Sequence, residues 1–218
     1  MKKALPIFII LFSLFLLPQK NTAQDYAAAL KINTLGISAE AMRSFGPNFN
    51  ARLGIAFFSY SADGGGGTGD DYKYSGALDL FSISALADYF PWERGFRISA
   101  GFLINLNKAT AEMTPTKTYI VGGDQYTPDK LGTMNATVDF NKIAPYIGIG
   151  FGNPTAGDSG LGFTFDIGTV YQGAPSVDLE ATGLISPSAS PEQEALIEDN
   201  LNWFKWYPVV SFGLTYKF

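Results

Sequence analysis

Apolar and polar residues alternate along most of the chain with a period of two. From Phe96 to Leu106 the even positions are all apolar, and most of the odd positions between them are polar or small. Side chains of a strand point alternately to its two sides, so this pattern predicts strands with one apolar face. The same reasoning predicts strands over residues 30–43, 51–62, 76–90, 96–108, 161–172 and 206–218.

A seventh stretch, residues 133–151, changes parity part-way. Its apolar positions are even up to Phe140 and odd from Ile143. A β-bulge or a two-residue turn at Asn141-Lys142 would each explain the change. A bulge gives seven strands and starts the chain on the outer side, whereas a turn gives eight but moves the earlier long loops to the periplasm. Bacterial barrels usually have an even number of strands, so we predict eight, with one strand unassigned.

The second face of these strands decides between a soluble and a membrane protein. It carries glycine, alanine, serine and threonine with isolated charges, whereas the wet face of a soluble β-sandwich usually carries many Lys and Glu. A barrel in lipid is apolar outside and polar inside, and small residues suit a narrow interior. The pattern predicts an all-β fold, an antiparallel transmembrane β-barrel of eight strands, over a soluble sandwich or lipocalin-like barrel.

The first residues are typical of a secretory signal peptide. Lys2 and Lys3 precede an apolar run from Ala4 to Leu17, which is shorter than the roughly 20 residues of a membrane helix. We place the cleavage site after Ala23, so that residues 1–23 are the signal peptide and residues 24–218 the barrel domain. The alternative is an uncleaved N-terminal anchor.

Composition limits the chemistry available. Loss of the three lysines of the signal peptide takes the formal charge from −5 to −8, which does not favour nucleic-acid binding. The chain has no cysteine and no histidine, so disulfides, serine-hydrolase triads and His-dependent metal sites are excluded. Asp63, Asp70 and Asp71 lie in a glycine-rich stretch, but their spacing favours a solvated loop over a calcium site. We expect no enzyme, cofactor or metal.

The ending "YPVVSFGLTYKF" resembles the C-terminal insertion signal of bacterial outer-membrane β-barrel proteins. "NARLGIAFFSYSA", "FRISAGFLINLNK" and "DFNKIAPYIGIGFGN" also resemble small barrels of the opacity-protein and OmpA type. The resemblance implies an outer-membrane location, surrounding lipid and lipopolysaccharide, and handling by periplasmic chaperones and the barrel assembly machinery. The residues of this insertion signal are Phe212, Leu214, Tyr216 and Phe218.

Short turns are predicted at 45–50, 91–95 and 152–160, and long connections at 62–75, 109–132 and 173–203. In outer-membrane barrels the short turns are periplasmic. Six charged residues on the inward face of the strands lie close to these turns or to the C-terminus, so we expect them to gather in the periplasmic half of the lumen. Two roles are open for them, a gate or selectivity filter and a structural network of ion pairs, and the narrow lumen favours the second. The residues are Glu40, Arg52, Asp88, Arg97, Asp166 and Lys217.

The third long connection carries the one helix signal. Ser190 suits the N-cap and Pro191 the first helical position, with acidic residues following. We consider two placements, over the barrel mouth or at the membrane interface, a level favoured by aromatic residues such as Trp203, Trp206 and Tyr207.

Two functions are compatible with these features. The first is an outer-membrane barrel with a structural or surface-interaction role and a largely plugged lumen. The alternative is a narrow passive porin-like channel for small solutes, with the inward charges setting its selectivity.

Overall fold

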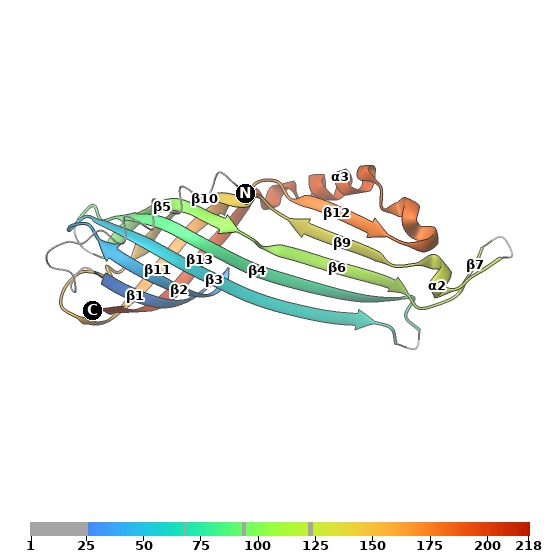
Figure 1. Ribbon diagram of the computed structural model, residues 1–218, viewed down its shortest axis with the longest axis horizontal. Coiled ribbons are helices and arrows are strands. Elements are labelled where there is room, and N and C mark those ends of the chain that lie inside the picture. The colour runs from blue at the N-terminus through green and yellow to red at the C-terminus, as the bar shows by residue number, and fades with distance from the viewer. Residues whose placement is uncertain (1–25, 68, 93–94, 122–123) are drawn as a thin grey trace.

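The computed structural model describes residues 26–67, 69–92, 95–121 and 124–218, and the predicted signal peptide lies outside these ranges. Eleven strands form one antiparallel sheet, and eight of them close into a barrel (Figure 1). The predicted fold class is confirmed. The barrel strands in ring order are β1 (Tyr26–Asn33), β2 (Gly36–Ser44), β3 (Phe49–Gly65), β4 (Tyr72–Tyr89), β5 (Phe96–Asn105), β10 (Ile143–Phe151), β11 (Gly160–Tyr171) and β13 (Trp206–Lys217).

The unassigned eighth strand lies at the start of the barrel. The prediction of one strand over 30–43 is wrong, because the chain turns at Thr34-Leu35 and forms the β1–β2 hairpin. Gly36 follows this turn with φ of 112°, and a Cβ there would overlap the carbonyl oxygen of Phe57. Only glycine satisfies both the positive φ and the close approach to β3.

Residues 133–151 contain neither a simple bulge nor a hairpin. They form β9 (Met134–Asp139) and β10, which do not pair with each other. β10 pairs with β5 and β11 in the barrel, whereas β9 pairs with β6 (Lys108–Pro115) and β12 (Ser176–Ala181). The parity changes where the chain passes from one part of the sheet to the other.

The predicted long loops are largely wrong as well. β3 and β4 continue beyond the barrel and combine with β6, β9 and β12 into a five-stranded extension (Figure 1). Smaller elements complete this end of the molecule: β7 (Tyr119–Val121), β8 (Asp124–Tyr126), α2 (Pro128–Leu131), η2 (Gly183–Ser188) and η3 (Asn202–Lys205). Among the described residues, no helix is long and apolar enough to cross a membrane.

The predicted loop helix is α3 (Pro191–Asn200), with Pro191 at its first position. It lies beside β12 (Figure 1), and therefore belongs to the extension rather than to the barrel mouth or the membrane interface. Its Glu198 and Glu194 accept hydrogen bonds of 2.9 Å from the backbone N–H groups of Val177 and Leu179. A hydrogen bond from its own backbone and another from the Ser190 hydroxyl lower the pKa of Glu192.

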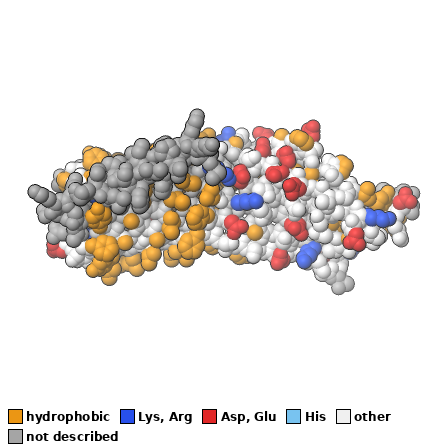
Figure 2. Space-filling model, viewed as in Figure 1, with side chains coloured by type: hydrophobic (Ala, Val, Ile, Leu, Met, Phe, Trp, Pro, Cys, Tyr) orange, Lys and Arg blue, Asp and Glu red, His pale blue; other side chains and the backbone are white. Residues whose placement is uncertain are grey.

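Large apolar side chains cover the outside of the barrel, whereas acidic side chains are frequent over the extension (Figure 2). Aromatic pairs lie near both ends of this surface, Phe49 with Tyr89 and Tyr171 with Trp206. Such a surface requires a bilayer around it. We call it the apolar belt; it includes Leu30, Ile32, Ile37, Ile55, Phe57, Phe81, Phe102, Ile143, Ile147, Ile149, Phe163, Ile167, Phe212 and Leu214.

We expect Ile147→Lys to lower the free energy of unfolding by about 2–4 kcal/mol, because it places a charge against lipid midway along β10. Ile147 is 57% exposed, and Ile120 at the tip of the extension is 68% exposed. Ile120→Lys is therefore the matched control, with an expected change of about 0.5 kcal/mol or less. Denaturant titration in liposomes measures both. Equal effects at the two sites would contradict the assignment of the belt.

Candidate functional site

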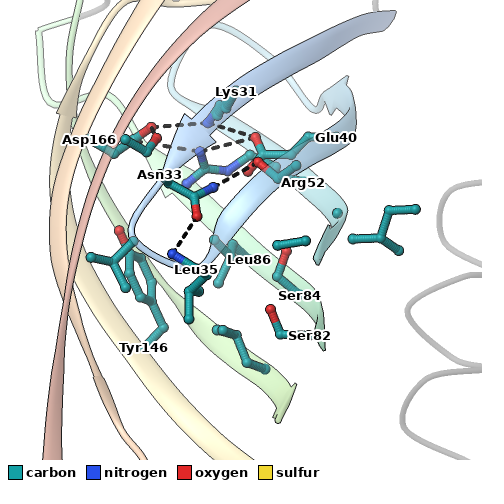
Figure 3. Close-up of a pocket in the computed structure, with 17 residues that line it drawn as sticks. Lys31, Asn33, Leu35, Glu40, Arg52, Ser82, Ser84, Leu86, Tyr146 and Asp166 are labelled. Carbon is teal, nitrogen blue, oxygen red and sulfur yellow. Dashed lines mark hydrogen bonds and ion pairs between the residues drawn. The ribbon is translucent and has the colours of Figure 1, made fainter. Parts of the chain in front are cut away.

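Six charged side chains from six strands meet inside the barrel. Five of them belong to the predicted set, and the sixth is Lys31 of β1, which the sequence analysis missed. Lys217 lies outside the group and donates a hydrogen bond to the carbonyl of Gly157. Figure 3 shows four of the six in the lumen. We call the group the charge network; its members are Lys31, Glu40, Arg52, Asp88, Arg97 and Asp166.

Asp166 is the central acid. One carboxylate oxygen lies 2.5 Å from Nη2 of Arg97 and 3.5 Å from Nη1 of Arg52, and the other lies 3.0 Å from Nζ of Lys31. The hydroxyl of Ser211 also donates to the second oxygen at 3.2 Å. Three cations therefore share one carboxylate.

The two remaining acids complete the charge balance. Glu40 lies 2.7 Å from Nζ of Lys31 and 3.4 Å from Nη1 of Arg52. Asp88 lies 3.1 Å from Nη2 of Arg52 and accepts a hydrogen bond of 2.5 Å from the hydroxyl of Ser99. The network thus holds three positive and three negative groups.

Every side chain of the network is at most 10% exposed. Isolated charges would be very costly at this depth, and mutual pairing offsets that cost. The cavity beside the network is about 50 Å³ and is lined by Ser82, Ser84, Leu86 and Tyr146 among others. It has room for a few water molecules and for no larger solute.

Glycines on the lumen wall make room for the charged groups. A Cβ at Gly213 would overlap the side chain of Lys31, and one at Gly150 would press on Asp166 and Arg97. A Cβ at Gly54 would lie 2.9 Å from Cγ of Glu40. The glycine-rich inner face noted in the sequence therefore fits the network in volume as well as in polarity.

An apolar layer closes the lumen on the side of the network that faces the extension. Leu35, from the β1–β2 turn, is 7% exposed. It belongs to a buried cluster that reaches across the barrel to Leu103, Tyr146 and Val209. This layer contains no charged residue.

A turn closes the lumen at the opposite end of the barrel, away from the extension. Pro154 and Thr155, between β10 and β11, are buried. The hydroxyl of Thr155 donates to the side-chain carbonyl of Asn50 at 3.0 Å. Lys217 holds the same turn through Gly157. Lys217 therefore fixes the turn between β10 and β11 instead of joining the network.

No protein-family model and no curated protein matches the chain. Among solved structures, it is similar to CarO of Acinetobacter baumannii, with 21% identity, a TM-score of 0.59, and coverage of 91% of this chain and 100% of that one. CarO2 of the same organism gives 21% identity, a TM-score of 0.58, and coverage of 89% and 98%. The chain has the fold of the small bacterial outer-membrane β-barrel proteins. A major outer membrane protein of Thermus thermophilus is more distant, at 16% identity and a TM-score of 0.43, with coverage of 88% and 99%.

The other predicted residues lie on the outer surface of the barrel, with the exception of Tyr207. Phe212, Leu214, Tyr216 and Phe218 are 47–63% exposed. Trp203, in η3, is 75% exposed, and Trp206, the first residue of β13, is 56% exposed. Tyr207, in contrast, is half-buried on the inward face of β13, where it packs against the buried cluster of Leu35 and donates its hydroxyl to the carbonyl of Thr34 at 2.6 Å. Within the described ranges, no group of three or more acidic side chains is placed to hold a metal ion.

We expect Asp166→Asn to destabilise the barrel by about 3–5 kcal/mol, because it leaves buried cations without their central carboxylate. Asp71→Asn is the matched control, since its partner Lys117 forms an exposed pair at 2.7 Å. That change should cost at most about 1 kcal/mol. Reversible unfolding in detergent, followed by the gel shift of the folded barrel, compares the two. A loss at Asp166 no larger than at Asp71 would contradict a structural role for the network.

Proposed function

We propose that the protein is a non-enzymatic outer-membrane barrel that anchors the extension outside the cell and has a plugged lumen. The observation that carries the proposal is the charge network, which spans the lumen with three acids and three bases. The Leu35 layer above it and the Thr155 turn below it add two further barriers. Three barriers in series favour an anchor over a path for solutes.

The second candidate is a narrow passive channel. Small residues line much of the lumen, and the charged groups lie at one level, as in a selectivity filter. Against this function, the cavity at that level is about 50 Å³, and the six charges neutralise one another.

The proposed partners follow from location and surface. The apolar belt would be surrounded by lipid and lipopolysaccharide. The barrel assembly machinery would recognise the exposed residues of the insertion signal, after periplasmic chaperones have carried the chain. These residues are Phe212, Leu214, Tyr216 and Phe218. The absence of histidine and cysteine from the whole chain supports a non-enzymatic role, and the charge of −8 after cleavage argues against nucleic acid.

We expect the refolded mature protein to show no unitary currents in planar bilayers. Replacing the pair Arg97 and Asp166 by alanine removes one base and one acid, keeps the net charge, and should open a leak at the level of the network. Lys117→Ala with Asp71→Ala removes an exposed pair and should leave the bilayer silent.

The channel gives the opposite pattern. Stable currents through the wild-type protein, with an ion preference that shifts in Asp166→Ala, would refute the plugged barrel and establish the second candidate. The extension would then surround the outer mouth of a conducting pore.

A further inference from the structure

One edge of the extension is an unpaired strand. β2 pairs with β3 only as far as Phe57, although β3 continues to Gly65. No residue in the described ranges pairs with the outer side of Phe58–Gly65, which we call the free edge. Residues 57–63 are all exposed, in contrast to the alternation lower in β3. An unpaired edge of this length is a template for another strand.

The backbone groups that point outward from the free edge can be identified. The N–H of Gly66 donates to the carbonyl of Tyr72, so the even residues of this segment bond to β4. In an antiparallel pair the bonded residues alternate, so the odd residues direct their N–H and C=O groups away from β4. These residues are Ser59, Ser61 and Asp63.

The opposite edge of the same sheet is protected. Two outward N–H groups of β12 are bonded by Glu194 and Glu198 of α3. The free edge has no such cover among the described residues, and its sequence "FSYSADGG" contains no lysine, no proline and one charge. The usual devices that prevent strand pairing are therefore present on one side of the extension and missing from the other.

The two faces beside the free edge differ in chemistry. On one face Phe58 and Tyr60 are 44% and 61% exposed, next to Tyr74 and Leu78 of β4. On the other face lie the side chains of Ser59, Ser61 and Asp63, and a groove of about 380 Å³ whose lining includes Asp63, Glu112 and Glu180. A strand added here would meet aromatic groups on one side and hydroxyl and acidic groups on the other.

We propose that the free edge binds an extended segment of another polypeptide by antiparallel strand addition. Main-chain hydrogen bonds at Ser59, Ser61 and Asp63 supply the affinity. Alternation of apolar or aromatic residues with basic or hydroxyl residues supplies the specificity, because it matches the two faces. The inference rests on the proposed function, which places the extension outside the cell.

A second copy of this chain fits the free edge less well. Copies in one membrane share their orientation, so a two-fold axis along the membrane normal cannot bring two rising strands together antiparallel. A segment of a polypeptide outside the cell has no such restriction.

The test uses the protein in nanodiscs and a labelled peptide, acetyl-Lys-Val-Thr-Tyr-Lys-Val-Thr-Val-amide, with a peptide of the same composition in block order as control. We expect saturable binding of the alternating peptide only, measured by fluorescence anisotropy. Ser61→Pro removes one outward N–H without touching the bonds to β4 and should weaken binding about tenfold or more. Ser61→Ala keeps the backbone donor and should bind like the wild type.

Amide exchange supplies an independent measurement. Bound peptide should protect the N–H groups of Ser59, Ser61 and Asp63, whereas those of the even residues, already bonded to β4, should change little. Equal binding of both peptides, unchanged affinity in Ser61→Pro, or pairing of two copies abolished by Ser61→Pro would each overturn the proposal. The plugged-barrel function is tested by the bilayer currents, which do not depend on peptide binding. Failure of strand addition can therefore be distinguished from failure of the plugged-barrel function.

Discussion

Closure of the barrel by β1 and β13 is the constraint on which the structure depends. The bilayer core offers no water, so each backbone N–H and C=O of a spanning strand must find a partner in the protein. The first and last barrel strands provide it, with Ala27 to Asn33 in register with Lys217 to Ser211. The N–H of Phe218 adds a bond to the carbonyl of Tyr26. The barrel therefore cannot close until its last residues are present.

The narrow lumen that follows from closure determines the interior. Lys31 of β1 reaches past Gly213 of β13 to the carboxylate of Asp166 on β11. The charge network thus crosses the seam where the ring closes, and a glycine on the intervening strand makes the crossing possible. A shift of β1 by one residue against β13 would turn Lys31 from the lumen toward lipid, so this buried charge disfavours such a shift.

The sequence was sufficient for five of the eight barrel strands, the outer surface and five members of the network, because alternation reports directly which side of a strand meets lipid. It was insufficient at the β1–β2 hairpin. There Leu35 continues the apolar spacing of Ile37 and Ala39 although it points into the lumen, so the turn resembled part of a strand. Because the hairpin was missed, Lys31 was not recognised as an inward residue. The available signal for the hairpin was the change of the apolar residues from even positions (Leu30, Ile32) to odd positions (Ile37, Ala39).

The sequence predicts loops in place of the extension, because the pattern of apolar and polar residues changes face there. In the barrel the apolar residues of a strand mark its lipid-facing side, whereas in the extension they lie on the other side. On the outer face of β3, Ile55 and Phe57 are followed by Ser59 and Ser61, which marks the height at which lipid gives way to water. On the inner face of the same strand, Arg52 is followed further along by Phe58 and Tyr60. Below this height apolar side chains are stabilised by the bilayer, and above it they lose that solvent. Phe58 and Tyr60 are exposed above this height, at the free edge for which strand addition is proposed, and a strand that covered them would remove their apolar surface from water.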